Sequence, residues 1–304
     1  MDIHTETFGQ EYPFKPNYIK IDGVRLHYVD EAPLNNLQAE PIVMLHGNPT
    51  WSFLYRKFIP PLIEAGYRAI AVDHIGYGRS DTPLERELYR LHNRIRFFSG
   101  VMDALKLSNI TLVMQDWGGP IGLGYAVNNP DKIKRLILMS TWAFELPGYT
   151  EENFPPLFAM CRQPWLGEAM LLGFNVFVEG FFPGAVIRKE KITPELMAAY
   201  RAPFPDYNSR IPTMAIQDVP LDKDHPSFGT MKNIEGQLKK LNVPTLLVWG
   251  EDDQLMAPEL ADMAWKLFYP HSEMHIVPRA GHFIQEDAPE EVVAIIKDFL
   301  GRNP

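Results

Sequence analysis

The chain has 304 residues, of which 46% are hydrophobic and 22% are charged. That length predicts one large domain or a domain that carries an insertion. Twenty-nine basic against 38 acidic residues give a formal net charge of −9, which argues against a nucleic-acid-binding surface or a polybasic membrane patch. A single cysteine, Cys161, excludes an internal disulfide framework.

The first residues, "MDIHTETFGQEYPFKP", carry acids and prolines where a signal peptide has a basic and then an apolar region. No stretch approaches the roughly 18 uninterrupted apolar residues of a membrane span. The sequence therefore predicts a cytoplasmic protein with no membrane partner.

The predicted elements begin with a β-hairpin, "YIKI" and "VRLHYVDE", joined at Asp22-Gly23. Short apolar strands separated by helical patterns follow, at 41–46, 67–73, 110–115 and 134–140, and the pattern resumes at 243–250 and 273–278 before a closing helix at 288–300. Continuous apolar runs are typical of strands buried on both faces. Alternating strands and helices predict an α/β fold with a mostly parallel, twisted central sheet flanked by helices.

The segment from 145 to 230 differs from the rest because it is rich in Phe, Met, Leu, Pro and Trp and shows helical spacing without a convincing strand. A linker would be polar and far less aromatic. We therefore expect a core domain of residues 1–144 and 231–304, with a helical cap domain of residues 145–230 inserted after the sixth core strand. Its aromatic side chains are expected to fill its own core and to line a cavity beneath it.

The motif "QDWGG" follows an apolar strand and precedes a helix-compatible stretch. In that setting, a nucleophile is held on a strained turn at the carboxyl end of a sheet strand. Asp116 would be an ordinary helix cap if it stood alone. Three further motifs at strand ends favour a nucleophile instead.

The first motif is "LHGNPTW", residues 45–51, which also follows a strand. A backbone N–H of this loop, together with one from the residue after the nucleophile, could form an oxyanion hole. The side-chain amide of Asn48 and the indole N–H of Trp117 add two neutral donors. Their convergence beside a carboxylate predicts a site for a departing anion.

The second motif is "PRAGHF", which places His282 after the last strand, as expected of a general base. The third is "WGEDDQL", whose three acids Glu251, Asp252 and Asp253 compete to orient the imidazole. Asp253 is favoured because it begins the loop proper. The order of nucleophile, acid and histidine is that of the α/β-hydrolase triad.

Taken together, "LHGNPTWSFLYRKFIPPL", "AVDHIGYGRSDTP", "LVMQDWGGPIG", "YRAPFPD" and "AGHFIQEDAPEEV" resemble haloalkane dehalogenases of the α/β-hydrolase superfamily. The resemblance spans residues 17–302. It implies the α/β-hydrolase fold and hydrolysis of haloalkanes to an alcohol and a halide ion. Asp116 would form a covalent alkyl ester, His282 and Asp253 would activate water, and Asn48 and Trp117 would hold the halide.

The resemblance also implies a pocket lined by Phe204 and Pro205, together with Leu255 and Phe283 beside the triad. A cap tryptophan, Trp165, could supply a further halide donor. No cofactor or metal is expected, and the partners are a small hydrophobic halogenated substrate, water and halide. The oligomeric state and the preferred haloalkane stay open.

Two alternatives remain. An epoxide hydrolase would use the same Asp116 and His282 but would need acidic tyrosines from the insertion, where Tyr149, Tyr200 and Tyr207 are available. A binding protein without turnover is opposed by the catalytically competent residues at every expected position. An aspartate nucleophile excludes a serine esterase, and it has a chemical rationale: an alkylated serine would be a stable ether, whereas an alkylated aspartate is an ester that water can cleave.

Overall fold

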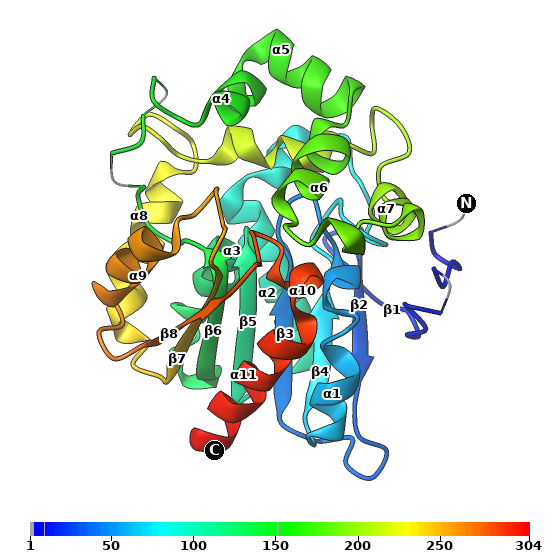
Figure 1. Ribbon diagram of the computed structural model, residues 1–304, viewed down its shortest axis with the longest axis vertical. Helices are drawn as coiled ribbons and strands as arrows, with labels where there is room; N and C mark the ends of the chain where they lie inside the picture. Colours follow the sequence, from blue (N-terminus) through cyan, green and yellow to red (C-terminus); the bar gives the residue numbers. More distant parts are fainter. Residues whose placement is uncertain (1–2, 9, 147, 151) are drawn as a thin grey trace.

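The computed structural model of the protein describes residues 3–8, 10–146, 148–150 and 152–304. Within these residues, eight strands form one sheet in the order β1-β2-β4-β3-β5-β6-β7-β8 (Figure 1). The strands are β1 (Asn17–Ile21), β2 (Val24–Glu31), β3 (Pro41–Leu45), β4 (Arg68–Val72), β5 (Ile110–Asp116), β6 (Ile133–Thr141), β7 (Thr245–Gly250) and β8 (Glu273–Val277).

The predicted hairpin and the predicted parallel strands are both present. β1 and β2 pair antiparallel across Asp22 and Gly23, whose φ angles of 49° and 88° are those of a tight hairpin turn. β2 also pairs antiparallel with β4. The remaining six strands, in the order β4-β3-β5-β6-β7-β8, run parallel to one another. Every residue of β3, β5 and β7 is buried, because helices cover both faces of the sheet.

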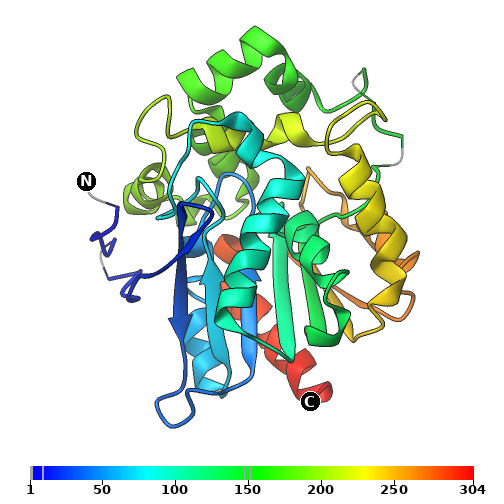
Figure 2. The same ribbon diagram turned by 180° about the vertical axis from the view of Figure 1, so that it is seen from behind.

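Helices form one layer on each face. α1 (Ile59–Glu64) and α11 (Pro289–Arg302) pack together on the face that is nearer in Figure 1. α2 (Leu91–Leu105), α3 (Gly118–Ala126) and α8 (Phe228–Gln237) pack together on the opposite face, as Figure 2 shows. α9 (Pro258–Lys266) packs against β7, and the short α10 (Ile284–Asp287) leads into α11.

The chain between β6 and α8 forms a helical segment over the carboxyl ends of the strands (Figure 1). It contains α4 (Pro156–Arg162), α5 (Pro164–Glu168), α6 (Phe182–Ala185), α7 (Pro194–Arg201) and the 3₁₀ turns of η7 (Ile211–Asp218). The predicted cap boundary at residue 230 falls inside α8, which packs on α2 and α3 of the core. The division into two domains remains a prediction.

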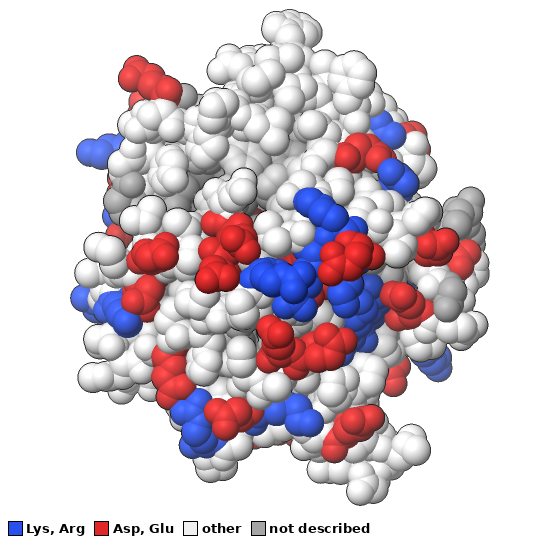
Figure 3. All heavy atoms as spheres, viewed as in Figure 1, with Lys and Arg blue, Asp and Glu red and all other residues white. Residues whose placement is uncertain are grey.

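The surface of this helical segment is poor in charge. In Figure 3, the charged side chains gather mainly over the lower and middle parts of the molecule, and few lie on the upper part, where α4 and α5 are in Figure 1. Large apolar side chains are exposed there instead, among them Leu157, Met160, Trp165, Leu166 and Phe174. No single helix in the described residues has the length and apolar composition to cross a membrane, although the bent pair 164–173 and 177–185 passes that test jointly.

Candidate active site

Asp116 ends β5 in the left-handed backbone region, with φ at 50°. Non-glycine residues adopt this region rarely, and such strain is concentrated at functional sites. The turn enters α3 directly, and the helix approaches the sheet so closely that a Cβ at Gly118 would lie 2.3 Å from the backbone oxygen of Leu45. Thr141, at the end of the neighbouring β6, donates to the backbone oxygen of Asp116 at 2.5 Å. The carboxylate is therefore aimed from a rigid support.

The loop after β3 contributes the next contacts. The backbone N–H of Asn48 donates to Oδ1 of Asp116 at 2.8 Å. The side-chain amide of Asn48 donates to the backbone oxygen of Thr213 at 3.3 Å, and the hydroxyl of Tyr77 donates to Oδ1 of Asn48 at 3.2 Å. The indole N–H of Trp117 has no hydrogen-bond partner among the residues that the structure describes. The role of Asn48 and Trp117 as halide donors stays a prediction.

His282 follows β8 and lies between two carboxylates. Its Nε2 is 3.6 Å from Oδ2 of Asp116, and its Nδ1 is 3.2 Å from Oδ2 of Asp253. The other oxygen of Asp253 accepts the backbone N–H groups of Leu255 and Met256 at 2.9 and 3.1 Å. All three side chains are buried, whereas Glu251 and Asp252 are exposed. Of the three competing acids, the fold brings Asp253 to the imidazole.

The two carboxylates control the charge of His282. Burial by itself lowers the pKa of the imidazole, but Asp253 and Asp116 outweigh it and raise the pKa to about 10. Burial by itself raises the pKa of Asp253. His282 and the backbone N–H donors outweigh burial, so that the pKa of Asp253 lies below the usual value. The carboxylates of Asp253 and Asp116 thus favour the protonated form of His282.

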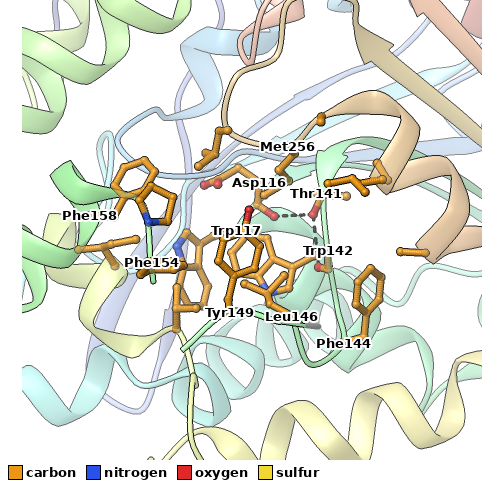
Figure 4. A pocket seen from close by; sticks show the side chains of 18 of the residues that line it. Asp116, Trp117, Thr141, Trp142, Phe144, Leu146, Tyr149, Phe154, Phe158 and Met256 are labelled. Carbon is orange, nitrogen blue, oxygen red and sulfur yellow. Dashed lines mark hydrogen bonds between the residues drawn. The ribbon is translucent and has the colours of Figure 1, made fainter. Parts of the chain in front are cut away.

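An apolar cavity of about 420 Å³ opens above Asp116, within the range of about 300–1,000 Å³ that small-molecule pockets occupy. Figure 4 shows Asp116, Trp117, Thr141 and Trp142 together at the strand ends, with Phe154 and Phe158 of the helical segment across from them. Three exposed side chains also line the cavity: Leu260 and Met263 of α9, and Leu267 directly after it. The cavity therefore reaches the surface beside α9.

Of the five residues predicted to line the pocket, the cavity above Asp116 includes one among its described lining residues. Leu255 lines the cavity, but Phe204, Pro205, Phe283 and Trp165 are not among its described lining residues. Phe204 is buried against Tyr77, Phe283 packs on Phe181 and Phe182, and Pro205 is exposed. Trp165 is 89% exposed on the surface of α5.

Sequence reasoning missed the α9 face of the cavity and the contribution of Trp142. Leu260, Ala264 and Leu267 repeat at helical spacing, a pattern that could have indicated an apolar face on this helix. The described residues contain no group of three or more His, Cys, Asp or Glu side chains that could hold a metal ion.

Comparison with known proteins identifies the family to which the chain belongs. A family profile described as the alpha/beta hydrolase fold matches residues 40–289, so the chain belongs to the α/β hydrolases. It is 37% identical to a cis-3-alkyl-4-alkyloxetan-2-one decarboxylase of Shewanella oneidensis, over 95% of this chain and 89% of that protein. It is 34% identical to a haloalkane dehalogenase of Mycobacterium marinum, over 92% of each chain.

Solved structures agree. The haloalkane dehalogenase DbeA from Bradyrhizobium elkani superposes with a TM-score of 0.85 at 29% identity, over 95% of this chain and 98% of that one. The chain belongs to the haloalkane dehalogenase family, hydrolases that act on carbon–halide bonds.

Proposed function

We propose that the protein hydrolyses haloalkanes to an alcohol and a halide ion through an alkyl ester of Asp116. The observation that carries this proposal is the placement of the Asp116 carboxylate. Its Oδ1 accepts the backbone N–H of Asn48, its Oδ2 faces His282, and both lie at the base of an apolar cavity. Oδ2 is thus the oxygen that is available to attack a substrate carbon.

In the first step, Oδ2 displaces halide from the carbon that carries it. The charge of the carboxylate moves to the halide, which needs hydrogen-bond donors but no proton. The indole N–H of Trp117 has no competing partner among the described residues, and the Asn48 amide has a second hydrogen besides the one donated to Thr213. These two groups are proposed to hold the halide.

In the second step, water cleaves the ester. Alkylation removes the negative charge of Asp116 and with it one of the two carboxylates that hold the pKa of His282 near 10. Loss of that charge lowers the pKa of the imidazole, so that neutral His282 accepts a proton from the attacking water at Nε2, while Asp253 keeps the proton on Nδ1. As water adds to the ester carbonyl, the charge develops on Oδ1, where the Asn48 N–H already lies at 2.8 Å.

The tyrosine positions favour this reaction over epoxide hydrolysis, in which the epoxide oxygen needs an acid. Tyr149 lines the cavity. Tyr200 is buried and donates to Glu286 at 2.6 Å, and the exposed Tyr207 donates to Glu168 at 2.6 Å. Only one of the three candidate tyrosines is therefore available to a substrate above Asp116.

A second candidate function follows from the 37% identity to the oxetanone decarboxylase. The same attack by Asp116 on C4, the saturated ring carbon bonded to the ring oxygen, would open an oxetan-2-one, and a carboxylate would be the leaving group. Loss of CO₂ would then form a carbon–carbon double bond as the Asp116 carboxylate departs. This sequence of steps consumes no water and needs no base.

His282→Phe separates the two functions. With 1-bromobutane, the variant is expected to release one equivalent of bromide and to retain a butyl group on Asp116, seen as a mass increase on that peptide. With a cis-3,4-dialkyloxetan-2-one, it is expected to keep releasing CO₂ if decarboxylation is the native reaction. His271→Phe, at an exposed histidine, is the matched control, and Asp116→Ala should abolish both reactions. The dehalogenase proposal fails if wild-type protein binds 1-bromobutane and releases no bromide.

The proposed reaction takes a haloalkane and water and needs no cofactor. A cytoplasmic location remains a prediction from the sequence.

A further inference from the structure

Arg94 is a buried cation that forms no ion pair with any described carboxylate. It lies on α2, and its side chain is 2% exposed. Its Nε donates to the backbone oxygen of Tyr89 at 2.5 Å, and Nη2 donates to the backbone oxygen of Pro212 at 3.4 Å. Burying a charge without a counter-charge is unfavourable, so the position calls for a compensating role.

The guanidinium lies behind the expected halide donors. Its central carbon is 5.1 Å from the ring centroid of Trp117 and 5.9 Å from that of Tyr77. A cation over an indole face draws electron density from the ring, which makes the indole N–H a stronger donor. Trp117 in turn lines the cavity beside Asp116.

A second path leads from Arg94 to Asn48. The backbone oxygen of Pro212 accepts both Nη2 of Arg94 and the hydroxyl of Tyr77, the latter at 2.6 Å. The same hydroxyl lies 3.2 Å from Oδ1 of Asn48. The single proton of this hydroxyl is held mainly by Pro212 and is shared with Asn48. Because Arg94 also donates to the Pro212 oxygen, more of that proton is left for Oδ1 of Asn48, which polarises the amide N–H groups of Asn48.

The field of Arg94 is also evident at neighbouring groups. Burial is the main cause that lowers the pKa of His46 to about 4, and the charge of Arg94 lowers it further. Burial, followed by His46 and then Arg94, lowers the pKa of His74. At His46 the charges of Asp73 and Asp116 are larger and act in the opposite direction.

The direction of charge transfer gives this cation its role. During displacement, a negative charge moves from Asp116 to the departing halide beside the indole of Trp117. Arg94 lies over the face of that indole. The positive charge is thus in place before the anion forms.

We propose that Arg94 is the fixed positive charge of the anion site, acting as a positioning residue through Trp117 and through Tyr77 to Asn48. This inference rests on the proposed function, since it assigns the departing anion to that site. The anion is the leaving group, either a halide or the carboxylate of an opened oxetanone.

The test is sodium bromide binding to the resting enzyme, measured by tryptophan fluorescence quenching and by inhibition of 1-bromobutane turnover. Arg94→Met is expected to weaken bromide binding at least about tenfold, and Arg94→Lys, which keeps the charge, is expected to restore most of it. Arg79→Met is the matched control. Arg79 is also buried, stacks on Tyr12 and Trp51, and donates to backbone carbonyls remote from Asp116. Its variant should bind bromide as wild type does.

Unchanged bromide affinity in Arg94→Met, or equal weakening in Arg79→Met, overturns the inference. If Arg94→Met does not fold, Tyr77→Phe tests the path to Asn48, and bromide binding within twofold of wild type would count against it. Sodium butanoate titrated in parallel separates the two possible leaving groups. A site for the carboxylate of an opened oxetanone should bind butanoate more tightly than bromide, and a halide site should bind bromide more tightly. Fluorescence quenching reads bromide binding without turnover, so absence of halide release from haloalkanes would refute the proposed reaction while leaving the role of Arg94 measurable.

Discussion

Gly47 is a sharp test of how closely the Asp116 carboxylate is placed. A Cβ at Gly47 would lie 2.2 Å from Oδ1 of Asp116 and 2.3 Å from its Cβ, whereas ordinary contact begins at 3.4 Å. The difference between 3.4 Å and 2.2 Å requires the carboxylate or the loop to shift by 1.2 Å. Asp116 already has a φ of 50° and accepts the adjacent Asn48 N–H, so neither partner can move without losing alignment.

Gly47→Ala is therefore expected to lower kcat/KM for 1-bromobutane by about 100-fold, the usual effect of misplacing a reacting group by about 1 Å. Overpacking should also lower the free energy of unfolding by about 1–3 kcal/mol. Bromide release gives the first quantity and urea unfolding the second. Gly236→Ala is the control, because a Cβ there meets nothing within 4 Å. If Gly47→Ala keeps more than about a third of wild-type kcat/KM while folded, close placement of the carboxylate does not limit the reaction.

Three further predictions concern the base, its partner and the cavity. The pKa of His282 in the folded protein is raised to about 10 from an unfolded value of about 6.5. The stability that this group contributes is thus fully present below pH 6.5 and is lost as the pH rises towards 10, so urea unfolding of wild type and His282→Phe should converge over that interval. Asp253→Asn should slow ester hydrolysis by about 100-fold or more and let alkylated Asp116 accumulate in rapid-quench mass spectrometry. Ala261→Phe, on the α9 face of the cavity, should lower the activity ratio of 1-bromohexane to bromoethane by roughly tenfold.

Each of these three predictions would be contradicted by a specific result. A pH-independent stability difference between wild type and His282→Phe would mean that the carboxylates do not raise the pKa of the imidazole. Asp252→Asn, at the exposed neighbouring acid, should hydrolyse the ester at the wild-type rate, and equal slowing in both variants would contradict the assignment of Asp253. An unchanged chain-length ratio in Ala261→Phe would show that substrates enter elsewhere.

The sequence alone determined the core sheet and the positions of the chemistry along the chain. Apolar runs of strand length, interrupted by helical patterns, define a parallel sheet because only strands buried on both faces lack polar alternation. Carboxyl ends of parallel strands meet at one edge, so Asn48, Asp116, Asp253 and His282 could be predicted to converge without coordinates. These contacts depend on local motifs at strand ends.

Only the tertiary structure decided which side chains surround the substrate and what lies behind them. Helical spacing shows that a segment has an apolar face, but not which neighbour covers it. Trp165 is therefore exposed, Phe204 packs away from the cavity, and α9 lines it instead. Arg94 is the clearest case: by sequence it is one charge on an amphipathic helix, and its role depends on Pro212, 118 residues away. Such long-range packing is set by how whole elements dock, which no local pattern encodes.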